Sequence, residues 1–102
     1  MAEQAWSIKI VPGSGGSAQF DPDVFGIDPG QPLKAQTDDV VSWDNQTNNL
    51  HQITIGGSPI TEIIPPWDSS TPGYVIQQTA PATITYGCSK HAGESGTIDV
   101  VA

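Results

Sequence analysis

Short runs of alternating apolar and polar residues recur along the chain, and none of them has the period of an amphipathic helix. In the first run, Trp6, Ile8 and Ile10 fall on one face. Eleven glycines and nine prolines separate these runs as turns. The pattern predicts an all-β protein, an antiparallel-rich β-sandwich of seven or eight strands. The expected strands cover 5–11, 38–45, 51–57, 60–64, 73–78, 82–87 and 96–101, with an edge strand over 29–36 that contains Pro32.

The length of the chain bounds its organisation. A chain of 102 residues suits one modest core, so we expect a single domain spanning residues 1–102. No run of about 20 apolar residues is present, which predicts no membrane insertion. The first residues lack the charged and apolar regions of a secretory signal. We therefore expect the chain to begin at a mature N-terminus; the alternative is that it is one domain cut from a longer protein.

The charge is strongly acidic. Eleven carboxylates face three lysines and no arginine, for a net charge of −8. Binding to nucleic acid is not expected, because phosphate contacts require lysine or arginine. Such a charge predicts a monomer that repels its own kind and attracts a basic partner. The alternative is that the acidic residues only maintain solubility.

Three residues stand out as metal ligands. Cys88 is the only cysteine, which excludes an internal disulfide, and His91 follows it three positions later. The other histidine, His51, opens a predicted strand 37 positions before Cys88. Strand ends and loops can meet at one pole of a sandwich, and one thiolate with two imidazoles is the ligand set of copper electron-transfer sites. The alternative for each histidine alone is a surface or hydrogen-bonded core position.

Two segments carry a family resemblance. The stretches "VVSWDNQTNNLHQITI" and "ATITYGCSKHAGESGTIDVV" resemble the two metal-binding segments of the cupredoxins, the type 1 blue copper proteins. The short ligand spacing is most similar to that of the amicyanin and plastocyanin branches, and the resemblance covers roughly residues 33–101. It implies a Greek-key β-sandwich, one copper ion per chain, and an electron carrier rather than an enzyme. It also implies a redox protein partner, cytochrome-like if basic, and a periplasmic or secreted location.

The sequence departs from the family at the axial ligand. The short ligand loop of the family has a methionine three positions after the second histidine, and this position is Glu94 here. The only methionine is Met1, far away in the sequence. We expect Glu94 to be the axial ligand; a carboxylate is a harder donor that favours Cu(II), lowers the potential and shifts the colour away from blue. The alternatives are an axial water or an empty position, or Glu62 as the ligand.

Residues around the ligands are expected to orient them. The family has an asparagine directly after its first histidine, and Gln52 occupies this position. We expect Gln52, Asn45 and Ser89 to form hydrogen bonds around the ligands. Thr47, Asn48 and Asn49 also lie close by in the sequence and, like Asn45, could substitute for the family's asparagine.

The resemblance also implies a docking surface. Cupredoxins pass electrons through the edge of the second histidine, which apolar residues surround. The candidates here are Leu50, Pro65, Pro66, Trp67 and Ala92, with Lys90 interrupting the apolar surface. The alternative for Trp67 is packing on its own proline-rich loop.

Other functions remain open at the sequence level. Two histidines, one cysteine and one glutamate also suit tetrahedral zinc, which could substitute for copper. A copper store or chaperone is expected to be rich in methionine, and this chain is not. A copper enzyme with an open site acting on a small molecule needs acid–base groups, for which Asp44, Glu62 and Lys90 are the candidates.

Overall fold

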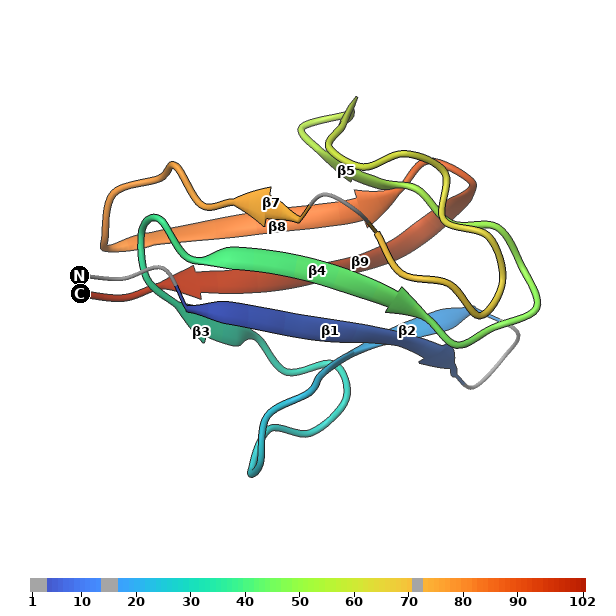
Figure 1. The fold of residues 1–102 in the computed structure, drawn as a ribbon, viewed down its shortest axis with the longest axis horizontal. Coiled ribbons are helices and arrows are strands. Elements are labelled where there is room, and N and C mark those ends of the chain that lie inside the picture. The colour runs from blue at the N-terminus through green and yellow to red at the C-terminus, as the bar shows by residue number, and fades with distance from the viewer. Residues whose placement is uncertain (1–3, 14–16, 71–72) are drawn as a thin grey trace.

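The computed structural model describes residues 4–13, 17–70 and 73–102, in which nine strands form two packed sheets (Figure 1). The first sheet has the order β2-β1-β4-β7 and contains β1 (Ala5–Pro12), β2 (Ala18–Pro22), β4 (Val40–Asn45) and β7 (Tyr74–Val75). The second has the order β3-β9-β8-β5-β6 and contains β3 (Leu33–Ala35), β5 (Ile53–Ile55), β6 (Ser58–Pro59), β8 (Ala82–Cys88) and β9 (His91–Val100). The predicted all-β sandwich is confirmed.

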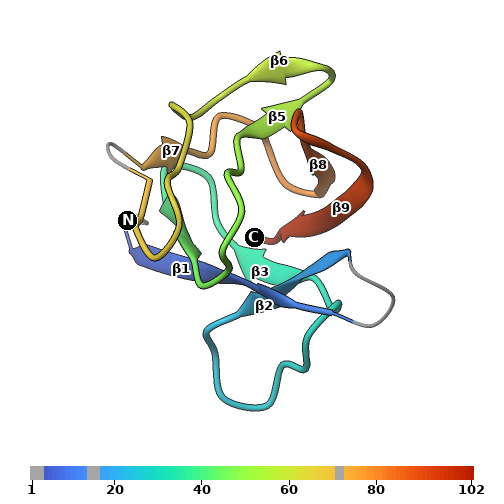
Figure 2. The same cartoon turned by 90° about the vertical axis from the view of Figure 1, so that its right-hand side faces the viewer.

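Strand pairing is mostly antiparallel. Two pairs are parallel, β1 with β4 and β3 with β9. The β8–β9 turn, the end of β4 and the start of β2 lie at the same end of the sandwich, opposite the C-terminus (Figures 1 and 2). No helix occurs in the described part of the chain, and hence none there that is long and apolar enough to cross a membrane.

The core follows the predicted alternation of the strands. Ile8 and Ile10 of β1 are fully buried, as predicted for that face. On β8 the inward face carries Ile84, Tyr86 and then Cys88, because successive side chains of a strand alternate between its two faces. Cys88 therefore ends an inward-facing row. The aromatic rings of Phe20 and Trp43 pack edge-on against Tyr86, with centroids 4.9 and 5.2 Å away.

The predicted strand over 60–64 is wrong. Gly56 and Gly57 have φ angles of 60° and 85°, so they form a tight turn that returns the chain at once to pair Ser58–Pro59 with β5. Of the predicted strand, only Ile64 pairs, in an isolated bridge with His51. The alternation in "ITEII" does not mark a strand here, because the apolar side chains of an irregular segment can also cover the core.

Strand β2, over Ala18–Pro22, was not predicted. Its two inward residues, Phe20 and Pro22, are buried. Its signal is weak because the strand is short and contains an aspartate and a proline. Such residues are tolerated here because β2 lies at the edge of its sheet.

Candidate metal centre

A two-residue turn joins Cys88 to His91. Cys88 ends β8, His91 begins β9, and the two are cross-strand partners around Ser89 and Lys90. Residues 91–95, which lie before the predicted strand over 96–101, are the first half of β9. This short connection places the thiol and the imidazole on neighbouring strands of the same hairpin.

Glu94 reaches the same point because β9 is irregular there. Residues three apart on a regular strand face opposite sides of the sheet. Gly93 has a φ of 89°, and the β8–β9 register shifts between Gly87 and Cys88. The alternation is therefore interrupted between His91 and Glu94.

His51 is held by backbone bonds just before β5. Its N–H donates to the Ile64 carbonyl at 3.2 Å, and the Ile64 N–H donates to the His51 carbonyl at 2.6 Å. The side chain is 1% exposed. The segment 60–64, which was wrongly predicted as a strand, thus holds His51 in place through these two backbone hydrogen bonds of Ile64.

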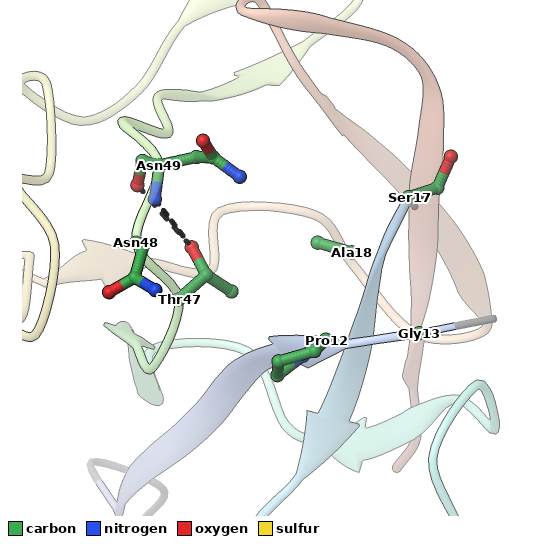
Figure 3. Close-up of a pocket in the computed structure, with 7 residues that line it drawn as sticks. All are labelled: Pro12, Gly13, Ser17, Ala18, Thr47, Asn48 and Asn49. Atoms are coloured by element: carbon green, nitrogen blue, oxygen red, sulfur yellow. Dashed lines mark hydrogen bonds between the residues drawn. The ribbon is translucent and has the colours of Figure 1, made fainter. Parts of the chain in front are cut away.

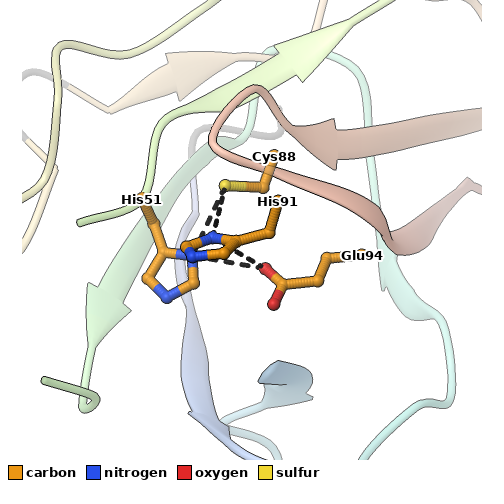
Figure 4. A group of neighbouring side chains, drawn as sticks. All are labelled: His51, Cys88, His91 and Glu94. Carbon is orange, nitrogen blue, oxygen red and sulfur yellow. Dashed lines mark hydrogen bonds and ion pairs between the residues drawn. The ribbon is translucent and has the colours of Figure 1, made fainter. Parts of the chain in front are cut away.

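The four side chains converge on one point (Figure 4). Their ligand atoms all lie within 4.8 Å of one another. Cys88 Sγ is 3.4 Å from His51 Nδ1 and 3.7 Å from His91 Nδ1. Glu94 Oε1 is 3.4 Å from His51 Nδ1 and 3.6 Å from His91 Nδ1. Three of the four residues are buried, and only the His91 side chain is partly open, at 34% exposure.

The tautomer of His51 follows from its neighbours. The Asn45 Nδ2 group donates to three backbone carbonyls, so Asn45 Oδ1 must face Thr47. Thr47 Oγ1 donates to that oxygen at 2.7 Å and therefore accepts from His51 Nε2, 3.0 Å away. With its proton on Nε2, His51 presents the bare Nδ1 lone pair to the cluster.

Burial also keeps His51 neutral. Removal from water lowers its pKa; the Glu94 carboxylate opposes this shift and His91 adds to it. The contact between His51 and Glu94 is therefore not an ion pair at neutral pH. Glu94 Oε1 is buried and has no hydrogen-bond partner among the described residues, whereas Oε2 accepts from the Ala18 N–H at 2.7 Å.

The sulfur has a donor of its own. The Lys90 N–H donates to Cys88 Sγ at 3.4 Å. Without a metal, the Cys88 thiol can donate its hydrogen to His51 Nδ1, but Glu94 Oε1 then still lacks a donor. A cation satisfies all these lone pairs at once.

We expect the metal-free protein to lose stability as the pH is lowered below about 6.5, the ordinary pKa of histidine. The unfolded chain then binds a proton at His51 that the folded chain, with its lowered pKa, does not bind. For one proton the free energy of unfolding falls by at most about 1.4 kcal/mol per pH unit, until the pH passes the folded pKa. Urea unfolding of wild type and His51→Gln between pH 7.5 and 5 measures this, and equal slopes for the two would contradict it.

The residues that were expected to orient the ligands form hydrogen bonds near the site. The Ser89 Oγ–H donates to Gln52 Oε1 at 2.8 Å, and the Ser89 N–H donates to the Gln52 carbonyl at 3.0 Å. Gln52 thus connects the His51 segment to the Cys88 turn. Asn45 reaches the His51 side chain through Thr47.

Two features of the site were not predicted. Ala18 contacts Glu94 through its backbone, which leaves no trace in the type of side chain. The second is a pocket of about 210 Å³, and Thr47 and Ala18, which contact His51 and Glu94, contribute to its wall (Figure 3). Its lining consists of Pro12, Gly13, Ser17, Ala18, Thr47, Asn48 and Asn49.

The other candidate residues lie on the surface. Leu50 is 48% exposed and Trp67 66%, and Lys90 is also exposed; the side chain of Ala92 is outside the described part of the structure. The Trp67 indole donates to Asn48 Oδ1 at 3.0 Å. Glu62, the alternative axial carboxylate, is exposed and is not a member of the cluster.

Comparison with known proteins supports the fold. No protein-family model matches the chain, and no characterised protein matches it in sequence. A reduced Cu(I) form of an amicyanin variant at pH 4 superposes with a TM-score of 0.63 at 16% identity, covering 98% of this chain and 85% of the other. An oxidised amicyanin variant gives a TM-score of 0.58 at 15% identity, covering 97% and 82% of the two chains. The chain has the β-sandwich fold of the cupredoxins.

Proposed function

We propose that the protein is a mononuclear copper electron carrier whose metal is held by His51, Cys88, His91 and Glu94. One observation supports this most strongly. The buried Glu94 Oε1 atom lacks a hydrogen-bond donor among the described residues and lies beside two imidazole nitrogens, which in turn contact a cysteine sulfur. Buried carboxylate oxygens rarely stay without a partner, so a bound cation is the simplest account.

The spacing of the ligand atoms fits a metal ion. Bonds of about 2.0–2.3 Å at near-tetrahedral angles place neighbouring ligand atoms about 3.3–3.6 Å apart. Four of the six separations among the ligand atoms are 3.4, 3.7, 3.4 and 3.6 Å, and all six lie within 4.8 Å. The donor set of one thiolate, two imidazoles and one carboxylate favours copper through its soft sulfur, and zinc is the competing ion.

Bound copper would supply a one-electron couple, and the chain would set its properties. Thr47 fixes the orientation of His51, and the β8–β9 hairpin fixes Cys88 and His91. Ligands held this rigidly move little when the charge of the centre changes, which favours fast electron transfer. The Glu94 carboxylate adds a hard, negatively charged donor that favours the higher oxidation state and lowers the potential.

The partner and the compartment are part of the same proposal. His91 is the exposed ligand, and Leu50, Ile63 and Trp67 are large apolar residues exposed to solvent. The net charge of −8 favours a basic redox protein as the partner. The family resemblance favours a location outside the cytoplasm.

Copper titration tests the function. We expect the metal-free protein to bind one Cu(II) per chain, to develop a thiolate-to-copper charge-transfer band, and to show a reversible one-electron voltammetric wave. A zinc-loaded sample supplies the control, because zinc has no one-electron couple and should show neither the charge-transfer band nor the wave. Copper binding without a reversible wave would contradict the role of electron carrier.

A further inference from the structure

We propose that the backbone amide of Ala18 is a positioning group for the axial ligand, holding Glu94 so that it offers a single oxygen to the metal. This inference rests on the proposed copper function. Through this amide, β2 contributes to the metal centre, although it belongs to the first sheet and Glu94 lies on β9 of the second sheet.

The contact itself is short and well protected. The Ala18 N–H donates to Glu94 Oε2 at 2.7 Å, across 76 positions of sequence. The Glu94 side chain is 3% exposed, so water does not compete for this oxygen. Hydrogen bonds to a carboxylate are about twice as strong as those between neutral groups. One carboxylate oxygen is therefore engaged, and the other, Oε1, is the atom that faces the histidines.

The edge of the first sheet makes this amide available. Gly13 donates to the Ser17 carbonyl, so the next pair along the hairpin, Pro12 with Ala18, falls at a position without ladder bonds. β2 has only one neighbour in its sheet, and the Ala18 N–H points away from it. Glu94 takes up a donor that an edge strand would otherwise leave to solvent.

The arrangement has a chemical consequence. A carboxylate with both oxygens free can turn, or can bind a metal through both of them. With Oε2 held by Ala18, the carboxylate cannot turn without losing a buried hydrogen bond, and Oε1 stays the oxygen that faces the histidines. Groups that orient ligands in this way typically change metal affinity by about 10- to 100-fold when they are removed.

Proline at position 18 removes this N–H, and its ring Cδ takes the place of the amide hydrogen, so Glu94 Oε2 cannot keep its position against the backbone. Proline is tolerated at the first residue of an edge strand, and Ala18 gives no ladder bond to β1. Ala18→Ser retains the N–H and serves as the matched control. We expect Ala18→Pro to weaken Cu(II) binding by about 10- to 100-fold and to change the electron spin resonance spectrum, whereas Ala18→Ser keeps the wild-type affinity and spectrum.

The same substitution in a second parent protein, Glu94→Met, distinguishes a loss of ligand positioning from a general loss of structure. In a Glu94→Met protein there is no carboxylate for Ala18 to orient, so Ala18→Pro is expected to leave its spectrum and copper affinity unchanged. Equal effects in both backgrounds, or no effect in either, would overturn the proposal.

A metal-free measurement distinguishes this inference from the function on which it rests. The Ala18 amide of the metal-free protein is expected to exchange slowly with solvent and to lose this protection in Glu94→Ala. If that holds but copper does not bind, the copper function fails while the contact stands. If copper binds and the amide exchanges freely, the positioning role is wrong.

Discussion

Replacing Glu94 with methionine is expected to raise the reduction potential of the copper-loaded protein and to change its colour to intense blue. A thioether is a soft, neutral donor that favours Cu(I), whereas a carboxylate favours Cu(II). If the exchange weakens Cu(II) binding relative to Cu(I) by about 10- to 100-fold, the potential rises by about 60–120 mV. Voltammetry and the visible spectrum of the loaded variant measure the two effects together.

Three controls sharpen this experiment. Glu62→Met changes an exposed carboxylate outside the cluster and should leave the potential and the spectrum unchanged. Glu94→Gln keeps the shape but removes the charge, so its potential should lie between those of wild type and Glu94→Met. Cys88→Ser should abolish the thiolate band altogether. A Glu94→Met protein with the wild-type spectrum and potential would mean that Glu94 is not an axial ligand.

The cluster was predictable because its chemistry is carried by rare side chains. The chain has one cysteine and two histidines, and Glu94 stands where the family that the sequence resembles has its axial methionine. The structure brings these four residues together. The contribution of Ala18 was not predictable, since any residue except proline has the same amide and β2 was itself missed.

The fold was predictable where alternation and burial agree. The inward row of β8 and the apolar face of β1 were both expected. The segment 60–64 alternates in the same way but is held by single contacts, such as the bridge of Ile64 to His51. The start of β9 was missed because glycines at 93 and 96 resemble a turn, while Gly96 is needed for close packing: a Cβ there would lie 2.4 Å from the Tyr86 hydroxyl.

Replacing Asn45 with alanine is expected to have the largest effect on stability among the residues around the site. Asn45 is fully buried, donates to the carbonyls of Asn49, Ile64 and Pro65, and accepts two bonds from Thr47. Some of these carbonyls also accept from a second donor, which remains in the variant. Only some of the groups therefore lose their last hydrogen bond. Buried groups that lose a partner destabilise by about 1–3 kcal/mol each, and we expect a total loss of about 3 kcal/mol in urea unfolding of the metal-free protein.

The same substitution should reach the metal centre through Thr47. Without Asn45 Oδ1 the Thr47 hydroxyl proton is free to turn toward His51 Nε2, and the bare lone pair of His51 is no longer fixed on Nδ1. Nitrogen NMR of the metal-free variant should then show a mixture of His51 tautomers, and copper affinity should fall. Asn48→Ala is the control, since Asn48 is exposed and its side chain contacts the Trp67 indole; its effect on unfolding should stay within about 0.5 kcal/mol. A destabilised Asn45→Ala protein that still has only the Nε2–H tautomer would show that Asn45 supports the fold without orienting the ligand.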